Sequence, residues 1–137
     1  MLQNNNSMNH NAKKYLLYSF IFFFKFFILY RTRNGNNETA LHLASKSGHL
    51  HVAKALINAK GHTRRREILN CKDHRGNTPL HHCVLNGNYE LAKILVKSGA
   101  DLSMKNVSGK TAREEAIDMN HLAVLTLLKN DSTSVII

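Results

Sequence analysis

Apolar and polar positions recur in a fixed register from about residue 34 to residue 130. Thr39, Thr78 and Thr111 are separated by 39 and then 33 residues, and three sets of apolar positions keep the same intervals. These sets are Ala44, Cys83 and Ala116; Val52, Leu91 and Val124; and Leu56, Leu95 and Leu128. The sequence therefore predicts a repeated unit of 33 residues, whose first copy carries six extra residues.

The second copy predicts a turn followed by a short helix. Residues 73–76, Asp-His-Arg-Gly, are typical of a turn. Thr78 is suited to accept a free amide hydrogen of the first helical turn, and Pro79 follows where its missing N–H does no harm. Apolar residues then fall at i, i+3 and i+4, on one face of the helix: Leu80, Cys83 and Val84.

A second helix is predicted after a break at residues 86–88. Its inward positions are Leu91, Ala92, Ile94 and Leu95. Gly99 follows at a position that favours the left-handed conformation and ends the helix. Two helices this short cannot bury their apolar faces alone, so the copies must stack into an all-α solenoid.

This pattern resembles the ankyrin repeat over about residues 34–130. The stretch "GNTPLHHCVLNGNYELAKILVKSGAD" matches the family pattern almost throughout, "ETALHLASKSGHLHVAKALI" matches well, and "GKTAREEAIDMNHLAVLTLLK" matches more loosely. The resemblance implies an ankyrin-repeat solenoid of helix–loop–helix units with finger-like turns. It also implies a non-enzymatic protein–protein interaction module with no cofactor and no catalytic residue.

Members of this family bind partners through the finger tips and the inner faces of the first helices. The resemblance therefore implies a set of binding residues, taken position by position. They are Glu38, Lys46 and Ser47 in the first copy; His74, Arg75, Asn77, Leu85 and Asn86 in the second; and Val107, Ser108, Lys110, Asp118 and Met119 in the third. We expect a monomer that binds an unidentified protein.

The third copy departs from the pattern, because Arg113 and Glu115 replace apolar residues of its first helix. A terminal repeat needs a polar outer face, so this copy is predicted to be the C-terminal cap. Thr111 and Glu114 have the spacing of a capping box. Asn120 stands where glycine is usual and tolerates the left-handed conformation.

Three potential metal ligands or nucleophiles stand in a row, His81, His82 and Cys83. Adjacent helical residues point about 100° apart, so they cannot converge on one ion without further ligands. The resemblance instead implies that His81 and His42 bond near the helix start and across to the adjacent loop. Cys83 is interpreted as a small buried apolar residue. We predict no metal site.

The chain has a formal net charge of +10, of which residues 34–137 carry +5, with fourteen Lys/Arg against nine Asp/Glu. This mild bias favours an acidic partner but does not demand nucleic acid. The six extra residues of the first copy lie around Arg64, Arg65 and Arg66, which we interpret as a basic loop. It is either a solvated loop or a contact for acidic or phosphate groups. No nucleic acid is expected, because no stacking aromatic residues accompany the arginines.

Residues 1–33 carry five Lys/Arg and no acid, and they include the apolar stretch Tyr15 to Tyr30. Three interpretations stay open for it: a short membrane anchor, a helix that caps the first repeat, or a segment with no folded role. As a helix its sixteen residues extend only about 24 Å, short of a bilayer core near 30 Å. Residues 131–137 form a short tail.

Two cysteines are too few for a disulfide scaffold, which favours the cytoplasm, with membrane association as an open addition. Two further functions stay open beside that of a protein-binding adaptor. One is a regulatory segment of a larger enzyme, and the other is a membrane-anchored scaffold whose basic loop contacts acidic lipid or phosphate.

Overall fold

The computed structural model describes residues 9–59 and 62–129, which divide into two units between Thr32 and Arg33. Eight helices occur in these residues, and one isolated β-bridge joins Lys105 to Thr111. The helices are α1 (His10–Arg31), α2 (Ala40–Ser47), α3 (Leu50–Asn58), α4 (His62–Leu69), α5 (Pro79–Leu85), α6 (Tyr89–Lys97), α7 (Ala112–Asp118) and α8 (Leu122–Leu127). The expected all-α class is confirmed.

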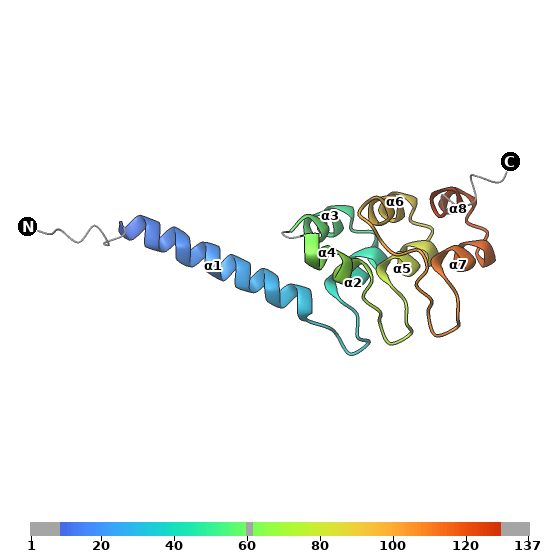
Figure 1. Ribbon diagram of the computed structural model, residues 1–137, viewed down its shortest axis with the longest axis horizontal. Helices are drawn as coiled ribbons and strands as arrows, with labels where there is room; N and C mark the ends of the chain where they lie inside the picture. The colour runs from blue at the N-terminus through green and yellow to red at the C-terminus, as the bar shows by residue number, and fades with distance from the viewer. Residues whose placement is uncertain (1–8, 60–61, 130–137) are drawn as a thin grey trace, which may run out of the picture. The chain divides into compact units, whose positions relative to one another are not determined.

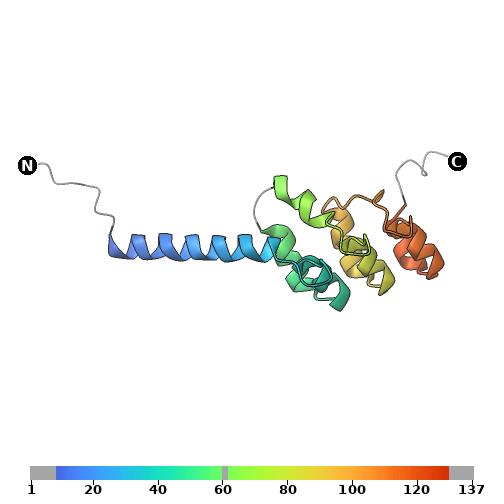
Figure 2. The same cartoon turned by 90° about the horizontal axis from the view of Figure 1, so that it is seen from below.

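Three helix pairs follow one another along the second unit: α2 with α3, α5 with α6, and α7 with α8. Figure 1 shows α2, α5 and α7 in one row, which we call the inner helices, and α3, α6 and α8 in another. A turn precedes each inner helix, and we call these turns the fingers (residues 34–38, 73–77 and 106–110). Figure 2 shows the three pairs in succession from a second direction. The predicted solenoid of three repeats is therefore confirmed.

Each inner helix begins at the threonine that the sequence marks as its cap. The hydroxyl groups of Thr39, Thr78 and Thr111 accept the backbone amides of the residues three positions later, and each helix has a reciprocal capping box. The cap satisfies amide hydrogens that have no carbonyl partner within the helix. Seven or eight residues suffice for each inner helix because the cap and the neighbouring repeats stabilise it.

The core of the repeats is aliphatic and follows the predicted register. Cys83, Val84, Leu91 and Leu95 have no measurable exposure, whereas Ile94, predicted to face inward, is half-buried. Val52 departs further from the predicted burial, because this residue is 50% exposed. Its counterpart Leu91 lies on α6, which packs against α3 of the preceding repeat. In residues 33–129 no repeat precedes the first one, so Val52 has no such cover.

The prediction of a loop around Arg64, Arg65 and Arg66 is wrong, because this segment forms helix α4. Residues 62–69 contain no Gly, Pro, Asn, Asp or Ser, and Arg, Glu and Leu are good helix formers. Ile68 and Leu69 are buried and hold the end of α4 against the core. The insertion is therefore an ordered part of the first repeat.

Helix α1 forms the first unit. It has 22 residues, with Lys13, Lys14, Lys25 and Arg31 as its charged residues and no acid. Nine of its large apolar residues are 40–72% exposed: Tyr15, Leu16, Leu17, Tyr18, Phe20, Ile21, Phe22, Phe24 and Ile28. Among residues 9–59 and 62–129, none of the helices combines the length with the sustained apolarity that crossing a bilayer requires.

Candidate functional site

The three fingers are built on one hydrogen-bond plan. An Asn or Asp opens each finger, and its side-chain oxygen accepts the amides of the residues two and four positions later at 2.9–3.1 Å. The accepting residues are Asn34, Asp73 and Asn106. A side chain that holds two amides in this way fixes the turn from within. Each finger tip is therefore held in one shape before any partner arrives.

Neighbouring fingers are also joined to each other. The amide of His74 donates to the carbonyl oxygen of Asn36 at 3.1 Å, and the amide of Val107 donates to that of Arg75 at 2.9 Å. Gly76 makes the second approach feasible. Its φ is +72°, and a Cβ there would lie 2.9 Å from the amide nitrogen of Val107. The fingers therefore form one connected row.

Two buried histidines, placed alike in the first and second repeats, tie each of these repeats to the next. The Nδ1 atom of His42 accepts the amide of Thr39 at 3.1 Å, and its Nε2 lies 2.9 Å from the carbonyl oxygen of Asn77. His81 does the same with Thr78 and, at 3.0 Å, with Lys110. Burial lowers the pKa of both imidazoles. The predicted local and cross-repeat roles of His42 and His81 are confirmed.

Most of the residues predicted to bind a partner lie at the surface. Leu85 and Lys110 are half-buried, and nine others are exposed: Lys46, Ser47, His74, Arg75, Asn86, Val107, Ser108, Asp118 and Met119. Val107 stands at the tip of the third finger and is 74% exposed. The finger tips and inner helices thus present polar and apolar side chains together. Their role in binding stays a prediction.

Glu38 and Asn77, from the same predicted set, are buried instead. A carboxylate oxygen of Glu38 accepts the side-chain amide of Asn34 at 2.7 Å, and that hydrogen bond lowers the pKa of Glu38 against the effect of burial. The side-chain oxygen of Asn77 accepts the side-chain amide of Asn106 at 3.1 Å. In this structure both side chains therefore brace the finger stems.

Two exposed apolar residues of the inner helices are missing from the predicted binding set. Leu43 on α2 is 43% exposed and Ile117 on α7 is 54% exposed. Leu43 occupies the position of His82, whose imidazole reaches the stem of its own finger. The signal available in the sequence was the repeat register, which gives Leu43 the same position on its inner helix as His82. These residues add apolar surface near the predicted set.

One group of possible metal ligands occurs in the described residues: Glu38, Asp73 and His82, with ligand atoms within 4.8 Å of one another. Each already has a partner within the protein. The Nε2 of His82 lies 2.8 Å from Oδ2 of Asp73, and the ammonium group of Lys46 lies 3.2 Å from Oε1 of Glu38. The lysine supplies positive charge at this point. We therefore interpret the group as an internal polar network that joins the finger stems to the inner helices.

Cys83 lies on the buried face of α5 with no exposure. Burial raises the pKa of its thiol to about 12. A nucleophilic cysteine needs an accessible thiolate, and this environment disfavours it. The interpretation of Cys83 as a buried apolar residue is confirmed.

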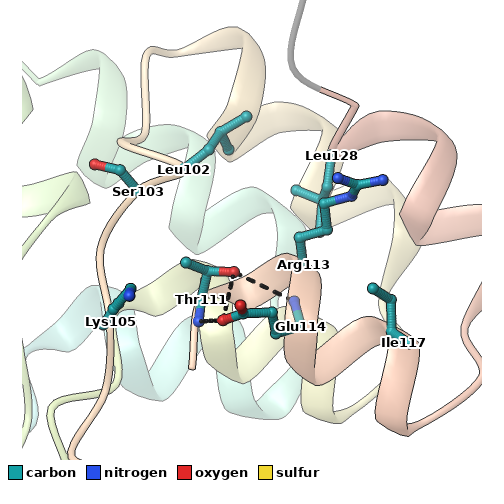
Figure 3. Close-up of a pocket in the computed structure, with 8 residues that line it drawn as sticks. All are labelled: Leu102, Ser103, Lys105, Thr111, Arg113, Glu114, Ile117 and Leu128. Atoms are coloured by element: carbon teal, nitrogen blue, oxygen red, sulfur yellow. Dashed lines mark hydrogen bonds between the residues drawn. The ribbon is translucent and has the colours of Figure 1, made fainter. Parts of the chain in front are cut away.

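A pocket of about 440 Å³ lies beside α7, at the end of the solenoid. Figure 3 shows its lining residues, among them Thr111 and Glu114 joined by the predicted capping box. Arg113 and Ile117 are exposed here, whereas Leu80 and Val84, at the same positions of the second repeat, are buried. The third repeat covers that face of the second. The pocket is therefore the uncovered face of the last repeat among the described residues.

The predicted basic group lies on α4. Arg64 and Arg66 are exposed and Arg65 is half-buried. Arg66 lies close enough to Asp101 to lower the pKa of that carboxyl, after the larger effect of hydrogen bonds from Ser103. The arginines remain a candidate contact for acidic groups.

Comparison with known proteins gives one family and several partial relatives. The sequence model for ankyrin repeats (3 copies) matches residues 4–106 and 66–136. The chain is 45% identical over 51 residues to the ADP-ribosylation factor GTPase-activating protein AGD4 of Arabidopsis thaliana, covering 37% of this chain and 7% of that protein. It is 34% identical over 79 residues to AGD2 of the same plant, covering 58% and 9%.

A putative ankyrin repeat protein of Rickettsia bellii (strain RML369-C) is 35% identical over 74 residues, which is 54% of this chain and 44% of that protein. The matches therefore span less than half the length of each of these three relatives. The similarity lies in the repeats, and the rest of each relative has no counterpart in the aligned residues.

Proposed function

Because this chain belongs to the ankyrin-repeat family, we propose that it is a non-enzymatic adaptor that binds a partner protein through its fingers and inner helices. The observation that carries the proposal is a row of exposed tip residues on stiff stems. His74, Arg75 and Val107 stand at tips whose backbones are joined by hydrogen bonds. A surface that is ordered before binding loses less conformational entropy when a partner docks. We place this adaptor in the cytoplasm.

Affinity purification with the full chain tests the proposal through a matched pair of substitutions. Val107→Asp alters the tip of the third finger, and Val52→Asp makes the same change at another exposed valine, on α3. Partners that dock on the fingers should be depleted by V107D and retained by V52D. Equal recovery of all partners on both variants would contradict the proposal.

A second candidate is that the repeats form a regulatory segment of a larger enzyme. The support is the similarity to two proteins named as GTPase-activating proteins, of which this chain covers less than a tenth. Sequencing of the complete transcript decides this. An open reading frame that continues into a catalytic domain supports the candidate, and a stop codon directly after Ile137 together with an upstream stop codon in frame contradicts it.

Contact with an acidic membrane surface is a third candidate, supported by α1. At 100° per residue its four basic residues fall within a sector of about 120°, and the nine exposed apolar residues include positions outside that sector. The basic side chains of such a helix are attracted to an anionic bilayer surface, where its exposed apolar residues can be buried against lipid. The arginines of α4 offer an alternative contact for acidic lipid or phosphate.

Flotation of the full chain with anionic vesicles tests this third candidate. Replacement of Phe20, Phe22 and Phe24 by Ser should release the protein from the vesicles, whereas replacement of Arg64, Arg65 and Arg66 by Gln should leave it bound. Release by the arginine replacement would move the contact to α4. Failure of the unaltered chain to float would exclude both contacts.

A further inference from the structure

The inner helices differ in charge although they occupy the same place in three repeats. Histidines aside, α2 carries Lys46 as its one charged residue, and α5 carries none. Helix α7 carries one basic residue against three acids: Arg113 against Glu114, Glu115 and Asp118. In a chain with a formal net charge of +10, α7 is a local acidic segment. The charge of the inner helices therefore changes sign along the row.

An ion pair at one repeat position also reverses its polarity. In the first repeat, Lys46 at the end of α2 contacts Glu38 on the finger stem, 3.2 Å apart. In the third repeat the equivalent positions hold Asp118 and Lys110, which also form an ion pair. Asn77 and Leu85, at these positions in the second repeat, are uncharged. An ion pair between the inner helix and the finger stem thus occurs in the first and third repeats, with the positive and negative partners exchanged.

Burial decides which of these charges a partner meets. In the first repeat the side chain of Glu38 is 4% exposed and that of Lys46 is 53% exposed, so the surface presents the cation. In the third repeat the side chains of Lys110 and Asp118 are 44% and 48% exposed, and the carboxylate of the half-buried Glu115 also lies close enough to act on the ammonium group of Lys110. Two carboxylates beside one ammonium leave this end negative. The half-buried, uncharged Leu85 lies between the two ends.

We propose that the inner face takes an extended peptide segment of a partner protein that is acidic at one end, apolar in the middle and basic at the other. The acidic end lies over Lys46, the apolar part over Leu85, and the basic end over Asp118. This assignment rests on the proposed function, because it names the partner chemistry of the same surface. Charge complementarity of this kind fixes the orientation and register of a partner more than it adds affinity.

Helix spacing sets the length of such a segment. Packed helices lie about 8–10 Å apart, so the two steps from α2 to α7 cover about 16–20 Å. An extended chain rises about 3.3 Å per residue, which places the acidic and basic side chains about five or six residues apart.

Selection of binders from a random dodecapeptide library displayed on phage tests the proposal with the full chain as bait. The enriched peptides should share an acidic and a basic residue about five or six positions apart, with apolar residues between them and the two charges in one consistent order. Enriched peptides with no such charge pattern contradict the proposal.

The double substitution K110D/D118K provides the discriminating variant. It keeps the ion pair and the net charge, and it gives the third repeat the polarity of the first. The selected peptides should bind this variant about fivefold more weakly, the ratio expected from the loss of one favourable exposed ion pair near the upper end of its usual range. Binding within about twofold of the unaltered chain would overturn the proposal.

Two further variants separate the possible failures. K54E/E67K exchanges a basic and an acidic residue that are exposed on α3 and α4, outside the inner face, and should leave peptide affinity unchanged. A drop equal to that of K110D/D118K would contradict the proposal, because the peptides would then not distinguish charges of the inner face from charges elsewhere on the surface. Peptides weakened by V107D but insensitive to K110D/D118K would overturn the charge assignment while leaving the proposed function in place. Peptides insensitive to both, or no enriched peptides at all, would count against the proposed function as well.

Discussion

The Nε2 atom of His82 lies 2.8 Å from Oδ2 of Asp73, so helix α5 is joined to the stem of its own finger. The other carboxylate oxygen of Asp73 holds the amides of Arg75 and Asn77. One buried carboxylate therefore orders both the finger and its attachment to the inner helix. The position of the tip depends on polar contacts that respond to pH.

Stability should fall as the pH drops below about 6.5, because of His42 and His81. Burial lowers the pKa of both imidazoles in the folded chain, against the hydrogen bonds to backbone carbonyl oxygens, which raise it. In the unfolded chain they titrate near the ordinary value of about 6.5. The unfolded chain thus binds protons at a higher pH than the folded one, and the free energy of unfolding decreases as the pH falls through that window.

Thermal melts between pH 7.5 and 5 measure this effect. His81→Gln should flatten the slope of melting temperature against pH, whereas His51→Gln, at an exposed position of α3, should keep it. A variant H81Q with the unaltered slope would show that His81 does not contribute to the linkage.

Asp73 should add a separate loss of stability in acid. Burial raises the pKa of its carboxyl, but the hydrogen bonds from His82 and the backbone amides of Asn77 and Arg75 outweigh it and lower the pKa overall. The stabilisation is therefore present above the unfolded value of about 3.9 and is lost as the pH falls through the folded value. Urea melts should show less acid sensitivity below pH 4 in Asp73→Asn. Equal acid sensitivity in the unaltered chain and in Asp73→Asn would show that Asp73 does not contribute to this loss of stability.

Thr78→Ala should lower the free energy of unfolding by about 1 kcal/mol, since it removes the cap of α5. Leu95→Ala should cost more, roughly 2–5 kcal/mol, because it leaves a cavity at a position with no exposure. Urea melts rank the two. The reverse ranking would show that the capping hydroxyl matters more than stacked aliphatic contact in this short solenoid.

Gly76→Ala should destabilise the row of fingers by about 1–3 kcal/mol. The φ of Gly76 is +72°, and its new Cβ would lie 2.9 Å from a backbone nitrogen, which cannot move aside as a side chain can. Gly35→Ala is the matched control, because a Cβ there meets nothing within 4 Å, and its effect should stay within about 0.5 kcal/mol. Equal melting midpoints for the two variants would argue against the close approach of the second and third fingers.

Iodoacetamide should modify Cys71 well before Cys83 in the folded protein. Cys71 is half-buried, whereas Cys83 is buried with a thiol pKa of about 12. Mass spectrometry of Cys71→Ser should show almost no labelling until urea unfolds the chain. Rapid labelling of Cys83 in that variant would mean that α5 opens far more readily than its packing indicates.

The repeats could be predicted from the sequence because their signals are local. Thr78, Pro79 and Gly99 specify the start of one helix and the end of the next through backbone chemistry that needs no distant contact. Asn120 behaves in the same way, with a φ of 56° at a position where the pattern has glycine. Fold class and helix order follow from such residues.

The burial of Glu38 and Asn77 could not be predicted in this way. The family pattern places them beside the finger tips, but their side chains turn toward Asn34 and Asn106. Helix α4 was missed for a different reason, since an insertion between repeats was equated with a loop although its residues favour a helix. The burial of Glu38 and Asn77 depends on partners that come close only in the folded chain. For α4, the helix propensity of residues 62–69 was a signal available in the sequence.

Site-specific photo-crosslinking tests most directly the claim that a partner docks on the fingers and inner helices. A benzophenone amino acid is placed at Leu85, on α5 of the inner row, and in a second protein at Lys97, exposed on α6 of the other row. The account predicts partner adducts from position 85 that disappear when the chain also carries V107D, and few adducts from position 97. Adducts formed mainly from position 97, or adducts from position 85 that V107D leaves unchanged, would contradict it.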